Sequence, residues 1–131
     1  MSLAFDMLKR HEGYRPLPYT CTAGKMTVGY GHNLTESMST ELAETILQYD
    51  IKVATRELIK IFPNFCEYGE RRASALIDMM TNLGAPKFLG FKKMVAAIKA
   101  GNWNTAVDEV KDSIWYVQVG DRGEEIVSML R

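Results

Sequence analysis

The sequence predicts an α+β fold in which one small β-hairpin accompanies a mostly helical chain. Apolar residues recur at helical spacing over most of residues 40–130, whereas residues 25–30 alternate in the manner of a strand. Pro16 and Pro18 exclude a helix from the segment before that strand. We therefore expect a single domain, residues 1–131, with its β element at about residues 14–34.

A short helix is expected to begin the chain, with Ser2 as its N-cap and Gly13 as its end. Its apolar residues Leu3, Ala4, Met7 and Leu8 share one face. In the β element that follows, residues 22–25 are typical of a turn. Along the next strand Met26, Val28 and Tyr30 point to one side, and Lys25, Thr27 and Gly29 point to the other.

The rest of the chain is predicted to be helical. The expected helices cover residues 40–61, 70–83, 91–100, 105–111 and 123–130. Ser39 is the expected N-cap of the first of them, and Pro63 stops it. Asp121 and Glu124 have the spacing of a capping box, which would open the last helix.

Charge and hydropathy exclude several classes of protein. Sixteen basic and sixteen acidic residues cancel, so no global attraction to nucleic acid or to an anionic membrane is expected. No run of 18 apolar residues exists that would predict a membrane span. Asp6 and Lys9 interrupt the first ten residues, which therefore do not resemble a signal peptide. We expect a protein that stays in the cytoplasm until it is released.

Neither a disulfide framework nor a metal site is expected. The two cysteines, Cys21 and Cys66, are too few for a framework, and we expect no bridge between them. The two histidines are not accompanied by other metal ligands at a useful spacing. No motif in the chain calls for a cofactor.

Glu12 is the first candidate for a chemical role. It lies at the end of the first predicted helix, where the negative end of the helix dipole disfavours an ionised carboxylate. Partial burial would raise the pKa of this carboxyl further, as a general acid near neutral pH requires. Its position alone is more typical of an ordinary solvated glutamate at a helix end.

Two further candidates lie in the β element. Thr27, accompanied by Gly29 and Gly31, would leave open space above the sheet for a substrate chain. Alternatively, these glycines mark a bulge or a close approach of strand and helix. Cys21 stands beside the predicted turn, and a lone cysteine is more often an inert buried side chain than a reactive thiol.

Together these residues resemble the catalytic signature of the phage-type lysozymes, a family of glycoside hydrolases. Glu12, Cys21 and Thr27 have the spacing of that signature, and residues 11–14 and 27–32 match the two short motifs that surround it. Cys21 takes the place of the aspartate found in the T-even phage member, a replacement that the family pattern admits. The likeness continues downstream through residues 75–84, 90–91, 101–103 and 115–116, so it covers nearly the whole chain.

The resemblance implies a lysozyme-like fold, with a cleft between the hairpin and the helical lobe. It implies hydrolysis of the β-1,4 bond between N-acetylmuramic acid and N-acetylglucosamine, with Glu12 as general acid. Arg122 stands where the T-even phage member has an arginine that pairs with the catalytic glutamate. Cys21 and Thr27 would orient the attacking water. We interpret His32 as a supporting residue that forms a hydrogen bond within the hairpin region.

Three other functions stay open at this point. A lytic transglycosylase would use Glu12 without an activated water and would release 1,6-anhydro ends. A catalytically silent peptidoglycan-binding protein would keep the cleft without turnover. A purely structural or tail-associated phage component, enzymatic or not, is the third. In each case the expected partner is the glycan strand of peptidoglycan. We expect a monomer that depends on a separate holin or on a phage particle to reach the wall.

Overall fold

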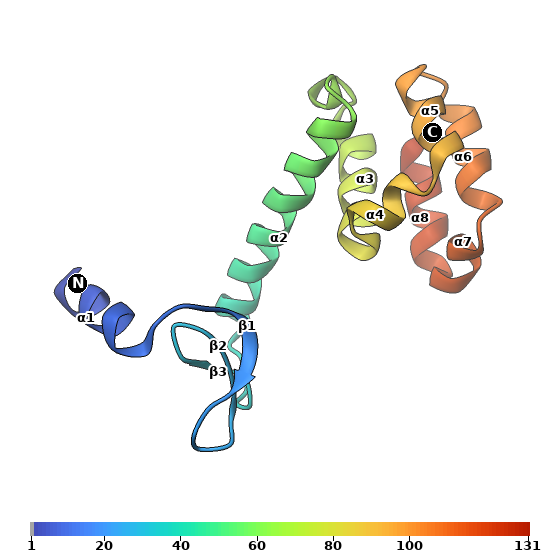
Figure 1. Cartoon of the computed structure of the whole chain (residues 1–131). Coiled ribbons are helices and arrows are strands. Elements are labelled where there is room, and N and C mark those ends of the chain that lie inside the picture. Colours follow the sequence, from blue (N-terminus) through green and yellow to red (C-terminus); the bar gives the residue numbers. More distant parts are fainter. Residues whose placement is uncertain (1) are drawn as a thin grey trace. The chain divides into compact units, whose positions relative to one another are not determined.

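A computed structural model describes residues 2–131, which divide into two compact units (Figure 1). The first unit comprises the chain up to Ala43, and the second runs from Glu44 to Arg131. The boundary falls in the first turn of helix α2 (Thr40–Ile61).

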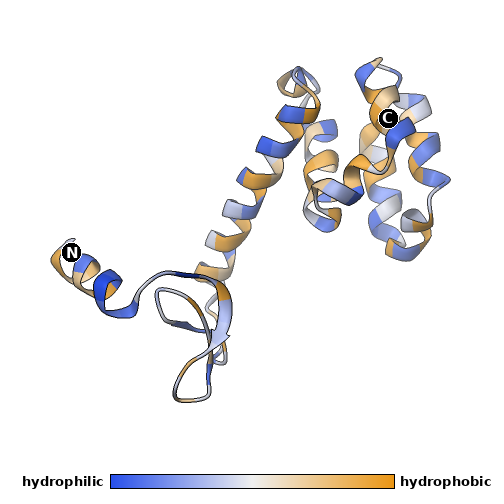
Figure 2. Cartoon of the chain, in the orientation of Figure 1, coloured by the Kyte–Doolittle hydropathy of each residue, from blue (hydrophilic) through white to orange (hydrophobic). Residues whose placement is uncertain are grey.

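The N-terminal unit holds one helix and a small sheet. Helix α1 (Ser2–Glu12) ends at Gly13, whose φ is 70° and whose N–H donates to Lys9 O at 3.0 Å. Ser2 lies inside this helix, so the prediction that it is the N-cap is wrong. None of the residues of α1 is buried. Most of its hydrophobic residues lie in its first two turns, and its last turn is hydrophilic (Figure 2).

The sheet has three antiparallel strands in the order β1–β2–β3. They are β1 (Arg15–Thr20), β2 (Met26–Gly29) and β3 (His32–Asn33). Thr27 is central, because it is paired with Tyr19 on one side and with Asn33 on the other. The pairing of β1 is irregular between Arg15 and Tyr19, the stretch that contains both prolines. The predicted hairpin is thus confirmed, and the short β3 adds a strand to it.

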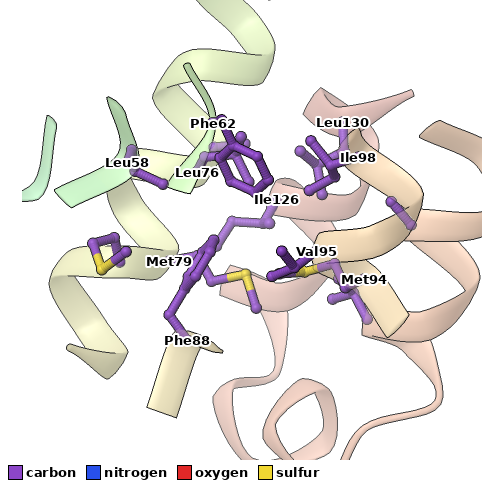
Figure 3. Packing of buried hydrophobic residues seen from close by; sticks show 14 of the residues in the cluster. Leu58, Phe62, Leu76, Met79, Phe88, Met94, Val95, Ile98, Ile126 and Leu130 are labelled. Carbon is purple, nitrogen blue, oxygen red and sulfur yellow. The ribbon is translucent and has the colours of Figure 1, made fainter. Parts of the chain in front are cut away.

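The C-terminal unit is helical and contains the hydrophobic core. After α2 come a short 3₁₀ helix and six α-helices: η1 (Phe65–Glu67), α3 (Glu70–Leu83), α4 (Ala85–Leu89), α5 (Lys92–Lys99), α6 (Trp103–Lys111), α7 (Ile114–Val119) and α8 (Asp121–Leu130). Helix α3 packs on α8, and α6 packs on both α5 and α8. Figure 3 shows the side chains of this core, among them Phe62, Met79 and Phe88. All three are fully buried.

The α+β class and the long helices agree with the sequence prediction. Helices α2 and α3 have the predicted bounds, and Ser39 caps α2 by accepting from the N–H of Leu42 at 3.1 Å. Helix α6 begins two residues earlier than predicted because Asn102 caps it, accepting from Thr105 N–H at 3.2 Å. The short elements η1, α4 and α7 were not predicted, since so few residues show no clear period.

The capping box predicted at the start of α8 is wrong. Asp121 is the first helical residue, and no side chain caps this end. The carbonyl of Gly120, a residue with φ 58°, accepts instead from the N–H groups of Gly123 and Glu124. Gly123 is also tightly packed, because a Cβ atom there would stand 2.8 Å from the Tyr116 ring. The helix therefore begins two residues before the predicted start, with its glycine against α7.

The described residues include no transmembrane helix, no metal-binding cluster and no disulfide. No helix among residues 2–131 is both long and apolar enough to cross a membrane. Within the same range, no three histidine, cysteine or acidic side chains gather as a metal site would require. Cys21 and Cys66 are both free thiols.

Candidate active site

Glu12 is the last residue of α1, and its carboxylate lies against the backbone of Gly31. A Cβ atom built on Gly31 would stand 2.6 Å from Glu12 Oε2 and 3.0 Å from Cδ. Gly31 also has a φ of 76°, which favours glycine independently. The glycine is therefore required by the close approach of helix and turn. Around Gly29, by contrast, a Cβ atom would meet nothing within 4 Å.

The Glu12 side chain is exposed. The partial burial considered from the sequence is therefore not present. The position at the C-terminal end of α1 agrees with the prediction, and Lys9, Arg10 and His11 accompany it in the last turn. These basic neighbours and the helix dipole act on the carboxylate in opposite directions.

Thr27 is buried, which corrects the expectation of an open surface at this residue. Only 6% of its surface is exposed, and its Oγ1 donates a hydrogen bond to Tyr19 O at 3.3 Å. The central position of Thr27 between two strands explains the burial. Its hydroxyl oxygen keeps lone pairs that can accept a further hydrogen bond.

Cys21 follows β1 directly and begins the turn that leads into β2. Its N–H donates to Lys25 O at 2.8 Å, and its carbonyl accepts from Gly24 N–H at 2.9 Å. Hydrogen bonding from the backbone of Lys25, and then of Ala23, lowers the pKa of the partly exposed Cys21 thiol. Because a thiolate is the nucleophilic and basic form, this turn favours a reactive cysteine over an inert one.

His32 does not have the surroundings that the sequence indicated. It lies in β3 as the partner of Val28, and its side chain is exposed. Among the described residues, no hydrogen bond to this imidazole is found. The expected hydrogen bond within the hairpin is therefore absent, because the short strand turns the ring outward to solvent.

Arg122 lies in the C-terminal unit, where it forms an ion pair that the sequence did not predict. Its Nε donates to Asp78 Oδ1 at 2.6 Å, with both side chains nearly half exposed. Both residues line a pocket of about 340 Å³ whose apolar wall includes Leu47, Ile51 and Ile77. Asp78 was missed, although a single acidic residue in the apolar run of residues 75–80 is a visible signal.

The N-terminal unit thus carries Glu12, Cys21 and Thr27 on one helix end and one small sheet. Cys21 lies two residues beyond Tyr19, the strand partner of Thr27, so thiol and hydroxyl belong to the same hairpin. One acid, one thiol of lowered pKa and one hydroxyl can supply proton transfer and hold a water molecule.

Comparison with known proteins finds a family that fits this set. The family model described as phage lysozyme matches residues 9–129. The pre-baseplate central spike protein Gp5 of Enterobacteria phage T4 is 26% identical, over 99% of this chain and 28% of its own length. The probable T4-type lysozyme 1 of Dictyostelium discoideum is also 26% identical, over 95% of this chain and 91% of its own.

An endolysin of Acyrthosiphon pisum secondary endosymbiont phage 1 is 33% identical, over 63% of this chain and 58% of its own length. The chain therefore spans less than a third of the spike protein, but nearly all of the Dictyostelium relative.

Proposed function

Because this chain belongs to the phage lysozyme family, we propose that it is a peptidoglycan hydrolase with muramidase activity. Residues 1–131 act as one catalytic domain on the β-1,4 bond between N-acetylmuramic acid and N-acetylglucosamine. The observation that carries this proposal is the Glu12 carboxylate, held against Gly31 in the unit that also holds Cys21 and Thr27. No cofactor or metal takes part in the proposed reaction.

Glu12 is the general acid of the proposed mechanism. Its carboxyl proton passes to the glycosidic oxygen as the bond to the anomeric carbon breaks. Because the Glu12 side chain is exposed, the bound glycan must exclude water from it during the proton transfer. Gly31 supports this role. Because it has no side chain, the Glu12 carboxylate can lie beside the turn.

Cys21 and Thr27 hold the attacking water. The Thr27 hydroxyl donates to Tyr19 O, so its oxygen is oriented to accept a hydrogen bond from the water. The Cys21 thiolate accepts a proton from that water while the oxygen attacks the anomeric carbon. The lowered pKa of this thiol supports such a role, because it raises the fraction of thiolate at neutral pH.

Arg122 serves Glu12 as an ion-pair partner in the proposed site. A guanidinium has five N–H donors in a planar fork, and the bond to Asp78 occupies Nε alone. The Nη groups are left to donate to a second carboxylate.

A second candidate function is that of a lysozyme carried on a phage particle. The match to the central spike protein over nearly all of this chain favours it. In this case the particle delivers the enzyme to the wall. Otherwise the enzyme is a monomer that stays in the cytoplasm until a separate holin opens the membrane.

Loss of turbidity of permeabilised Gram-negative cells tests the lytic activity. Reducing ends among the products identify a hydrolase, whereas 1,6-anhydro ends identify a lytic transglycosylase.

A further inference from the structure

Two tyrosines and a lysine form a cluster next to Glu12 that the proposed mechanism does not use. The ring centroids of Tyr14 and Tyr30 are 5.5 Å apart, with their planes tilted by 43°. The Nζ atom of Lys9 lies 5.5 Å from the centroid of the Tyr30 ring. We call Lys9, Tyr14 and Tyr30 the tyrosine–lysine cluster.

The chain places this cluster directly beside the candidate general acid. Tyr14 follows Glu12 by two residues, and Tyr30 precedes Gly31, the residue against which the carboxylate lies. Lys9 lies one turn before Glu12 on α1. A ligand that reaches the Glu12 carboxylate therefore lies within reach of all three side chains.

Both rings of the cluster are exposed, although apolar and aromatic surface is usually removed from water. The exposed fraction is 64% for Tyr14 and 44% for Tyr30. A single exposed aromatic residue needs no explanation, but two in contact beside a reactive group indicate a binding surface. Tyrosine suits this role, because its ring offers an apolar face and its hydroxyl can both donate and accept.

The charge of the surrounding segment fits an anionic ligand. Residues 9–33 contain four basic side chains and only one acidic side chain, Glu12, whereas the whole chain has no net charge. Within the described part of the chain, no ion pair involves Lys9. Its ammonium group lies over the rings of Phe5 and Tyr30, at 5.3 and 5.5 Å from their centroids. Its N–H donors are therefore available to an incoming carboxylate.

We propose that the tyrosine–lysine cluster is a subsite for the peptidoglycan strand. The exposed Tyr14 ring packs on the C–H face of one sugar, and Lys9 pairs with a carboxylate of the attached peptide stem. Tyr30 contacts both residues and so fixes their spacing. This inference rests on the proposed function. It assigns the sugar of the substrate to Tyr14 and the acidic peptide stem to Lys9.

Binding to purified sacculi tests the subsite in the full-length Glu12→Gln protein, which cannot turn the strand over. On intact sacculi, Lys9→Met and Tyr14→Ala should each weaken binding about fivefold, the size of one exposed contact. On sacculi whose peptide carboxylates have been converted to amides with a carbodiimide and ammonia, the Lys9→Met loss should vanish and the Tyr14→Ala loss should remain. Lys9→Arg and Tyr14→Phe should bind nearly as well as the parent protein.

Matched controls come from α2. Lys52→Met removes an exposed lysine and Tyr49→Ala removes a tyrosine that is 62% exposed, and both should bind like the parent. Parent-like binding by both cluster variants would overturn the subsite, as would an equal loss in the control variants. Lysis by the wild-type protein is measured on the same sacculi. Strong lysis by the wild-type protein, together with parent-like binding of the Lys9→Met and Tyr14→Ala variants, would therefore reject the subsite and leave the proposed function intact.

Discussion

The carboxylate of Glu12 occupies the space that a side chain on residue 31 would need, since a Cβ atom there would stand 2.6 Å from Oε2. Gly31→Ala should therefore displace the candidate acid. Misplacement by about 1 Å can reduce turnover about 100-fold, and we expect a loss of lysis of that order. The rate of clearing of permeabilised cells measures it.

Gly29→Ala is the matched control for this substitution. Gly29 has a similar φ of 68°, so alanine there carries the same backbone cost, but its Cβ atom would meet nothing within 4 Å. It should lower the melting temperature to a similar extent and keep most of the lytic activity. Equal losses of lysis in the two variants would show that backbone strain, and not contact with Glu12, is responsible.

Glu12→Gln should remove lysis while leaving the fold intact. The amide keeps the shape of the side chain but has no proton to give, so we expect at least about a 100-fold loss. The melting temperature should change little, because the carboxylate is exposed at a helix end. Lysis by this variant at the wild-type rate would place the active site elsewhere.

Substitution of Cys21 distinguishes hydrolysis from transglycosylation. If Cys21 helps to hold the water, Cys21→Asp should keep substantial activity, and Cys21→Ala should lose it because the water is held less well. A transglycosylase has no need of that water. Full activity of Cys21→Ala with 1,6-anhydro products would therefore contradict the proposed roles of Cys21 and Thr27. The proposed role of Glu12 as general acid would still stand.

The Cys21 thiol should react with iodoacetamide at a lower pH in the folded protein than in the unfolded protein. Because backbone hydrogen bonds in the turn lower the pKa of Cys21, its alkylation should reach half-maximal rate at a lower pH in the folded protein than in urea. A pKa depressed by folding stabilises the folded protein above the unfolded pKa, and this contribution is lost as pH falls through the folded pKa. Mass spectrometry of the labelled Cys21 peptide over a pH series, with and without urea, measures the difference. Lys25→Met should preserve it, since the Lys25 backbone contributes more than its side-chain charge.

Asp78 and Arg122 should differ in their effect on lysis, although each substitution breaks the same ion pair. The pair is nearly half exposed, so Asp78→Asn and Arg122→Ala should each cost less than about 1 kcal/mol of stability from its loss. Only Arg122→Ala also removes the proposed partner of Glu12, and its lysis should fall well below that of Asp78→Asn. Equal lysis by both would show that Arg122 has no role beyond its bond to Asp78.

The sequence predicted those features that depend on local periodicity. Helices α2 and α3 and the end of α1 at Gly13 follow from apolar spacing, capping residues and glycine. The burial of Thr27 could not be predicted, because it depends on a third strand of only two residues. Asp78 was also missed, since its partner Arg122 is 44 residues away in the chain. Long-range polar contacts leave little local pattern in a sequence.

The two prolines of β1 affect how the sheet meets other molecules. Strand β1 lies at an edge of the three-stranded sheet, where free backbone groups would ordinarily offer a template to a strand from another chain. Pro16 and Pro18 remove two N–H donors from this strand and make its pairing irregular. Sheet extension from this edge is therefore disfavoured, so β1 protects the unit that carries Glu12 against edge-to-edge aggregation.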